Sequence, residues 1–254
     1  MIFDTHAHYD DEQFDIDRES LLSSMAQAGI GNIVNVGANM ASSGKSLELA
    51  DKYDFMYAAV GVHPSDSAEL SEENLKKLKE MSSHKKCVAI GEIGLDYYWP
   101  EPDHEIQKTW FRRQLNLARE VKKPVIIHSR EAALDTITIM QQEDAATIGG
   151  VVHCFSYSKE IAKQCLDMGF YIGIGGVLTF KNGRKLKEVA QDIPLEKILL
   201  ETDCPYLAPV PYRGKRNCSL YLPLVVDALS EIKGISAEEV IRVTQENAKT
   251  MYRL

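Results

Sequence analysis

Short apolar segments rich in Val, Ile and Ala alternate with longer segments of mixed polarity along the whole chain. Within the short segments the apolar positions are nearly continuous, which is typical of parallel strands that are covered on both faces. The predicted strands cover residues 2–9, 32–38, 56–64, 87–96, 124–130, 148–155, 171–176 and 198–203.

The segments between the predicted strands have the periodicity of amphipathic helices. The clearest covers residues 106–121, where apolar side chains recur at helical spacing. A second predicted helix covers residues 71–81, with Ser71 as its N-cap but without the Glu or Gln that completes a capping box. A final helix is expected around residues 236–251.

Eight strand–helix units in a chain of 254 residues favour a single (β/α)8 TIM barrel. No Gly/Ser linker, charge block or internal repeat divides the chain, so we expect one domain over residues 1–254. An open, doubly wound α/β sheet is the alternative architecture.

The composition narrows the class of protein. A hydrophobic fraction of 44% excludes a disordered chain. The 37 acidic and 29 basic residues give a net charge of -8, which argues against non-specific electrostatic binding to long DNA. The five cysteines form no CxxC pair, the first residues lack the apolar core of a signal peptide, and no apolar run reaches the ~20 residues of a membrane span. We therefore expect a reduced, cytoplasmic protein with no membrane association and no obligate protein partner.

Polar side chains interrupt the apolar strands at their carboxyl ends. His6 and His8 are two residues apart on the first predicted strand, so their side chains point to the same side of the pleat. In a parallel barrel the carboxyl ends of all strands face one mouth, where active sites lie. The other residues of this kind are Glu92, His128, His153 and Asp203.

Four histidines and two carboxylates at one mouth predict a metal centre. They exceed the three or four protein ligands of one catalytic zinc ion, and a centre of two divalent ions bridged by Glu92 accounts for the surplus. Mixed imidazole and carboxylate ligands suit Zn, Mn, Ni or Co, and Mg is a further candidate. Two such ions would add four positive charges at the predicted mouth.

Five motifs in order, HAH, GEIGLD, IIHSR, VHCF and ETDCP, resemble the TatD family of metal-dependent deoxyribonucleases, which are amidohydrolase-like barrels. The resemblance covers essentially the whole chain. It implies one metal held by His6, His8, Glu92 and Asp203, and another held by Glu92, His128 and His153. One departure is Cys218-Ser219, where many relatives have Glu-Pro after RGKRN. We expect that loop near the substrate, so the departure bears on substrate preference.

Further residues at the predicted mouth are candidates for catalysis. Asp203 is the candidate acceptor for the proton of a metal-activated water, and Glu201 would orient a ligand or the nucleophile. His63 would contact the scissile phosphate or orient water. Asp4 and Asp96 are candidates for a hydrogen bond to a ligand imidazole.

Other residues at the predicted mouth are candidates for substrate contacts. Arg130, Arg213 and Arg216 are candidate phosphate contacts. The aromatic cluster at residues 97–99 is interpreted as loop packing in preference to a surface for stacking bases.

These residues favour a metal-dependent phosphodiesterase that acts on DNA ends as an exonuclease. One alternative is an amidohydrolase or ester hydrolase acting on a small molecule or an aminoacyl-tRNA. Many such barrels bridge their metals with a modified lysine on the fourth strand, whereas Glu92 stands there in this chain. A metal-binding scaffold without turnover is the remaining alternative, and the complete ligand set disfavours it.

Overall fold

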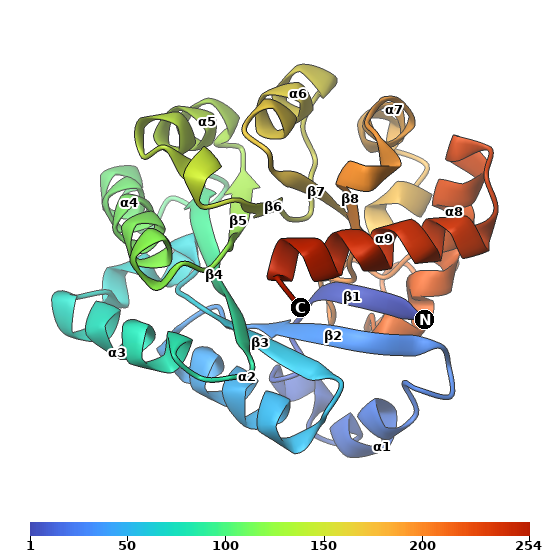
Figure 1. The fold of residues 1–254 in the computed structure, drawn as a ribbon, viewed down its shortest axis with the longest axis horizontal. Coiled ribbons are helices and arrows are strands. Elements are labelled where there is room, and N and C mark those ends of the chain that lie inside the picture. The colour runs from blue at the N-terminus through green and yellow to red at the C-terminus, as the bar shows by residue number, and fades with distance from the viewer.

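A computed structural model describes all 254 residues, and its eight strands form one parallel sheet in chain order (Figure 1). Each strand pairs with the next along the chain, as βαβ units require. All eight lie within the predicted segments, except that β2 begins two residues earlier. They are β1 (Ile2–Ala7), β2 (Ile30–Val36), β3 (Met56–Val60), β4 (Cys87–Asp96), β5 (Val125–Arg130), β6 (Gly150–Val152), β7 (Tyr171–Ile174) and β8 (Ile198–Leu200).

The sheet closes on itself where the chain passes beyond β8. The backbone N–H of Asp203 donates to His6 O at 2.9 Å, that of His8 donates to Cys204 O at 2.8 Å, and Ala7 forms a parallel bridge with Cys204. These bonds join the first strand to the last and exclude the open sheet. The prediction of a (β/α)8 barrel is confirmed.

Helices surround the sheet (Figure 1). The third helix begins where Ser71 was predicted to cap it, with its hydroxyl accepting from the N–H of Asn74. None of the helices combines the length and the apolar stretch needed to cross a bilayer. The helices are α1 (Arg18–Ser23), α2 (Met40–Lys52), α3 (Glu72–Ser82), α4 (His104–Val121), α5 (Ala133–Gln142), α6 (Lys159–Asp167), α7 (Arg184–Asp192), α8 (Leu222–Lys233) and α9 (Ala237–Tyr252).

The core has two parts because successive side chains of each strand point to opposite faces. A cluster of 50 buried residues lies between the strands and the surrounding helices. A second cluster of 12 joins the inward-facing strand residues to Ala248, Met251 and Tyr252 of α9. The Tyr252 hydroxyl also donates to Thr5 O at 2.7 Å. The last helix therefore covers one end of the barrel, and the functional residues lie at the other.

Candidate metal centre

Six predicted metal ligands converge at the carboxyl ends of the strands. His6, Glu92 and His128 lie within β1, β4 and β5, whereas His8 and His153 follow β1 and β6 directly. Asp203 comes three residues after the end of β8, and its backbone φ of 56° turns the chain sharply there. Asp adopts this left-handed conformation more readily than most residues do. The structure thus brings all six side chains to one place.

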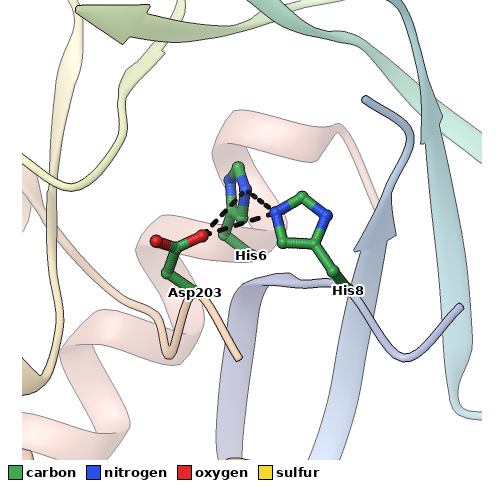
Figure 2. A group of neighbouring side chains, drawn as sticks. All are labelled: His6, His8 and Asp203. Atoms are coloured by element: carbon green, nitrogen blue, oxygen red, sulfur yellow. Dashed lines mark hydrogen bonds and ion pairs between the residues drawn. The ribbon is translucent and has the colours of Figure 1, made fainter. Parts of the chain in front are cut away.

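His6, His8 and Asp203 form the first half of the cluster and point toward one another (Figure 2). The Nε2 atoms of the two histidines are 3.1 Å apart, and Asp203 Oδ1 lies 3.4 Å from His8 Nε2. Glu92 Oε2 is 3.5 Å from His6 Nε2. Ligands held at ~2.0–2.2 Å from one ion are separated by about 3.0–3.6 Å, so these four atoms have the spacing of a coordination shell.

Glu92, His128 and His153 form the second half. Glu92 Oε1 lies 2.7 Å from His128 Nδ1 and 2.6 Å from His153 Nε2, and the two nitrogens are 3.3 Å apart. The other oxygen of Glu92 faces the first half, so this one carboxylate has an oxygen directed at each. Such an arrangement is that of a bridging ligand between two ions.

The charges of the cluster suit divalent cations. In each half two imidazole nitrogens face each other. A hydrogen bond between them needs a proton on one nitrogen and a lone pair on the other. A cation between them would instead bind the lone pairs of both nitrogens. Burial alone would raise the pKa of Glu92, but the neighbouring His153 and His63 outweigh it and hold the pKa well below its usual range. Burial lowers the pKa of His6 to about 4, which keeps that imidazole neutral and able to coordinate.

The second nitrogens of His128 and His8 meet a carboxylate and a carbonyl, whereas Nδ1 of His6 and Nδ1 of His153 are buried without a hydrogen-bond partner. His128 Nε2 lies 3.0 Å from Asp96 Oδ2, and His8 Nδ1 lies 2.8 Å from Val36 O. Such partners set the tautomer and orientation of a metal-bound imidazole. The hydrogen bond predicted for Asp96 is present. The participation of the Val36 carbonyl could not be predicted, because it depends on the pairing of β1 with β2.

Asp4 acts differently from the prediction. Its carboxylate contacts no ligand imidazole, and instead accepts from Thr202 N at 3.0 Å, from the Thr202 hydroxyl at 2.8 Å and from the Ser219 hydroxyl at 2.6 Å. Ser219 is buried, as is Cys218. Both side chains therefore face the protein interior, and the expectation that their loop lies near the substrate stays a prediction. The hydrogen bond from Ser219 to Asp4 therefore joins the loop after β8 to β1, two residues before His6.

Glu201 approaches His153 from the side opposite Glu92. Its Oε1 accepts from Cys154 N and lies 3.7 Å from His153 Nδ1, while Oε2 is buried without a partner. Gly173 makes room for this carboxyl, since a Cβ there would come within 2.3 Å of Glu201 Oε2 and 2.9 Å of His153 Cα.

Gly173→Ala is expected to displace Glu201 and destabilise the protein by about 1–3 kcal/mol, or roughly 2–10 °C in Tm. Thermal unfolding and kcat would be measured together, with Gly44→Ala in α2 as the control, because a Cβ at Gly44 meets no atom within 4 Å. Equal Tm values for the two variants would contradict the packing described for Gly173.

His63 also faces the cluster. It precedes the 3-10 helix Pro64–Glu69 and accepts from Ser65 N through Nδ1, which leaves Nε2 at 3.8 Å from Glu92 Oε1. Its ring lies 4.2 Å from that of His128. Burial lowers the pKa of His63 to about 3, so the imidazole is neutral beside the cluster. It is placed to touch a group bound between the two halves.

The three candidate arginines differ in their surroundings. Arg130 and Arg213 are exposed and form no salt bridge, and their guanidinium groups lie over the rings of Tyr98 and Phe180 at 3.7 Å and 4.4 Å. Arg216 is bound to both carboxylate oxygens of Asp17 and to Gln13 O. Its guanidinium is thus already engaged within the protein, and only the other two arginines are free to meet a phosphate.

Replacing Arg216 is therefore expected to affect stability more than substrate binding. Arg216→Ala should cost about 1 kcal/mol, or 2–4 °C in Tm, with KM changed by less than about twofold. Arg213→Ala is the matched comparison and should raise KM with little change in Tm. Melting curves and steady-state kinetics measure both, and a large KM effect of Arg216→Ala would show that this side chain leaves Asp17 to bind substrate.

Known proteins are similar to this chain in sequence and in fold. Residues 3–253 match the family described as TatD related DNase. A Bacillus subtilis protein described as the uncharacterized metal-dependent hydrolase YabD is 46% identical over all of both chains. A Pantoea vagans protein named 3'-5' ssDNA/RNA exonuclease TatD is 34% identical, again over the full length of both.

A solved structure is similar as well. The crystal structure of YJJV, a TatD homologue from Escherichia coli K12, superposes with a TM-score of 0.93 at 33% identity, covering 100% of this chain and 98% of that one. The match extends over the whole barrel, including every strand that carries a ligand of the cluster. The chain therefore belongs to the TatD family of metal-dependent hydrolases.

Proposed function

We propose that the protein is a deoxyribonuclease that hydrolyses phosphodiester bonds from strand ends with two divalent ions. The observation that carries the proposal is the Glu92 carboxylate, which directs one oxygen at each group of donors. Glu92 and the donors on either side of it would hold two ions, which would supply charge stabilisation for a phosphoryl displacement. The Pantoea vagans relative, named as an exonuclease of single-stranded DNA and RNA, supports the same class of substrate.

The proposed ligands are His6, His8, Glu92 and Asp203 for one ion, and Glu92, His128 and His153 for the other. When bound, the ions lower the pKa of coordinated water to roughly 7 and neutralise phosphoryl oxygens. The donor set suits Zn, Mn, Ni, Co or Mg. Glu201 Oε1 lies 3.7 Å from His153 Nδ1, just beyond hydrogen-bond distance, and a small approach of the two side chains would let this carboxylate orient the ring.

Asp203 is the proposed acceptor for the proton of the attacking water. Burial acts to raise the pKa of its carboxyl, but the hydrogen bond from His8 and the nearby histidines outweigh burial and lower it, so the group stays ionised. His63 Nε2, on the opposite side of Glu92, would contact the scissile phosphate. Arg130 and Arg213 are the cations available for the neighbouring phosphates.

The shortage of free cations favours action at ends. Non-specific affinity for long DNA depends on many phosphate contacts, each releasing counterions. This chain has a net charge of -8, and of the three candidate arginines only two are free. We therefore infer that few phosphates are held at a time and that the enzyme dissociates between cuts.

An assay on labelled single-stranded DNA tests the proposal. Purified protein would be incubated with 3′- and 5′-labelled strands in Mg, Mn, Zn, Co or Ni and in chelator. Mononucleotides should be released from one end in at least one metal, and chelator should abolish the release. Turnover of an ester or amide panel without release of nucleotides in any metal would favour the amidohydrolase alternative instead.

The cysteines bear on where the protein acts. All five are free, and four of them are buried. Free, buried cysteines behave as small apolar packing groups and persist in reducing compartments. We infer from this usage that the protein works in the cytoplasm.

A further inference from the structure

Tyr98 and Trp99 lie exposed beside the metal cluster, where the chain leaves β4. Their side chains are 49% and 53% exposed, and their rings meet edge to face with centroids 4.8 Å apart. Tyr97 differs, because its hydroxyl donates to Asp135 at 2.6 Å and its ring stacks on His104 at 3.7 Å. Loop packing, as predicted for all three, therefore describes Tyr97 alone.

The exposed pair is fixed to the cluster by short connections. The Asp96 carboxylate accepts from Tyr98 N at 3.0 Å through Oδ1, and its Oδ2 lies 3.0 Å from Nε2 of the ligand His128. Arg130 is two residues beyond His128, and its guanidinium lies 3.7 Å over the Tyr98 ring. Tyr98, Trp99 and Arg130, here called the β4–β5 rim, are thus held next to the metal ligands.

We propose that the β4–β5 rim binds the unpaired bases of a single-stranded DNA end, with Trp99 as the stacking surface. Arg130 covers a face of Tyr98, which rigidifies the rim and leaves the guanidinium N–H groups free for a phosphate. Every base has a π-face, so such a surface tolerates any sequence. The inference rests on the proposed function, since it assigns a substrate form to the same site.

The chemistry of the rim favours single strands over duplex. In a duplex the bases are already stacked and paired, and exposing one costs a few kcal/mol. Next to the rim in the chain, a hollow of about 400 Å³ is lined by Tyr97, Glu131, Ala132, Ala133, Leu134, Asp135 and Tyr157. Leu134 is 76% exposed there, which adds apolar surface for a second base.

Tryptophan fluorescence tests binding separately from turnover. The chain has two tryptophans, and Trp110→Phe leaves Trp99 as the sole reporter. The metal-loaded variant would be titrated with a phosphorothioate oligothymidylate and with a phosphorothioate strand of equal length made of abasic units. Stacking predicts strong quenching by the thymidylate and at least about tenfold weaker binding of the abasic strand. Equal quenching and affinity for the two strands would overturn the inference.

Kinetics test whether the rim serves the reaction. The quantity measured is the ratio of kcat/KM for single-stranded DNA to kcat/KM for bis(p-nitrophenyl) phosphate. This ratio should fall about tenfold in Trp99→Leu, because leucine keeps the apolar area but has no π-face. It should largely recover in Trp99→Phe. The control is Tyr171→Leu. Tyr171 likewise has a cation, Lys197, over its ring, but it lies at the start of β7, away from the carboxyl ends of the strands where the cluster lies. An unchanged ratio in Trp99→Leu would contradict the inference.

The two failures can be told apart. If no phosphodiester is hydrolysed in any metal, the proposed function fails, and the fluorescence titration still decides whether the rim prefers bases. If DNA is hydrolysed but the Trp99 variants keep the wild-type ratio, the function stands and the rim has no part in it.

Discussion

Glu92→Gln is expected to abolish turnover and to reduce bound metal at both halves of the cluster. The amide keeps one oxygen but replaces the other with an NH2 group, which has no lone pair for a cation. Since the two carboxylate oxygens face different halves, no rotation of the amide can serve both. Residues that hydrogen-bond a metal ligand typically contribute about 10–100-fold to metal affinity or activity. The loss of a ligand that bridges both ions should therefore cost on the order of 1,000-fold or more in kcat/KM.

Metal content and activity would be measured on the same samples, by elemental analysis after dialysis and by nucleotide release. We expect about two ions per wild-type chain and fewer than one and a half in Glu92→Gln. Glu101→Gln is the matched control, because Glu101 is exposed in the loop after the same strand. A variant of Glu92 that kept both ions and most of its activity would refute the bridging role.

Asp203→Asn is expected to lower kcat by about 10²–10⁴-fold at saturating metal, the range typical of a lost general base. The Asn side chain keeps an oxygen for coordination but cannot accept the proton of the attacking water. Single-turnover rates at several metal concentrations separate the two roles, since added metal restores lost ligation but not lost basicity.

Glu201→Gln provides the contrast. Its amide oxygen can take the place of the carboxylate oxygen that faces His153 Nδ1 at 3.7 Å, so the loss should remain within about 10–100-fold. If Asp203→Asn regained near-normal turnover once metal was saturating, Asp203 would be a ligand only, and another group would have to accept the proton.

The members of the cluster could be predicted because each breaks a strong local pattern. Glu92 is a carboxylate in a strand of Val, Ala, Ile and Gly, and His128 and His153 come at the ends of apolar strands. A polar residue in such a position is costly to bury without a partner, so its presence is informative. Parallel strands then bring these ends to one mouth, which makes the convergence a consequence of the fold.

Contacts between distant loops could not be predicted in this way. Arg216 belongs to a basic run that looks free in the sequence, and its partner Asp17 lies 199 residues away in the chain. The partners of Ser219 are Asp4 and Tyr9, equally distant. Neither the hydrophobic periodicity nor the local spacing of residues predicts such pairings. The strands β6 and β8 are also shorter than predicted, since the chain leaves the extended conformation at Cys154 and Asp203, whose φ angles are 43° and 56°.

The closure of the barrel between β1 and the chain beyond β8 has a consequence for biosynthesis. His6 and His8 leave the ribosome before Asp203 and the backbone that pairs with β1, which follow about 10–40 s later at roughly 5–20 residues per second. A nascent chain therefore holds the histidines without the carboxylate that completes their half of the centre. Hydrolytic competence therefore arises only late in synthesis, when β1 meets the segment that follows β8.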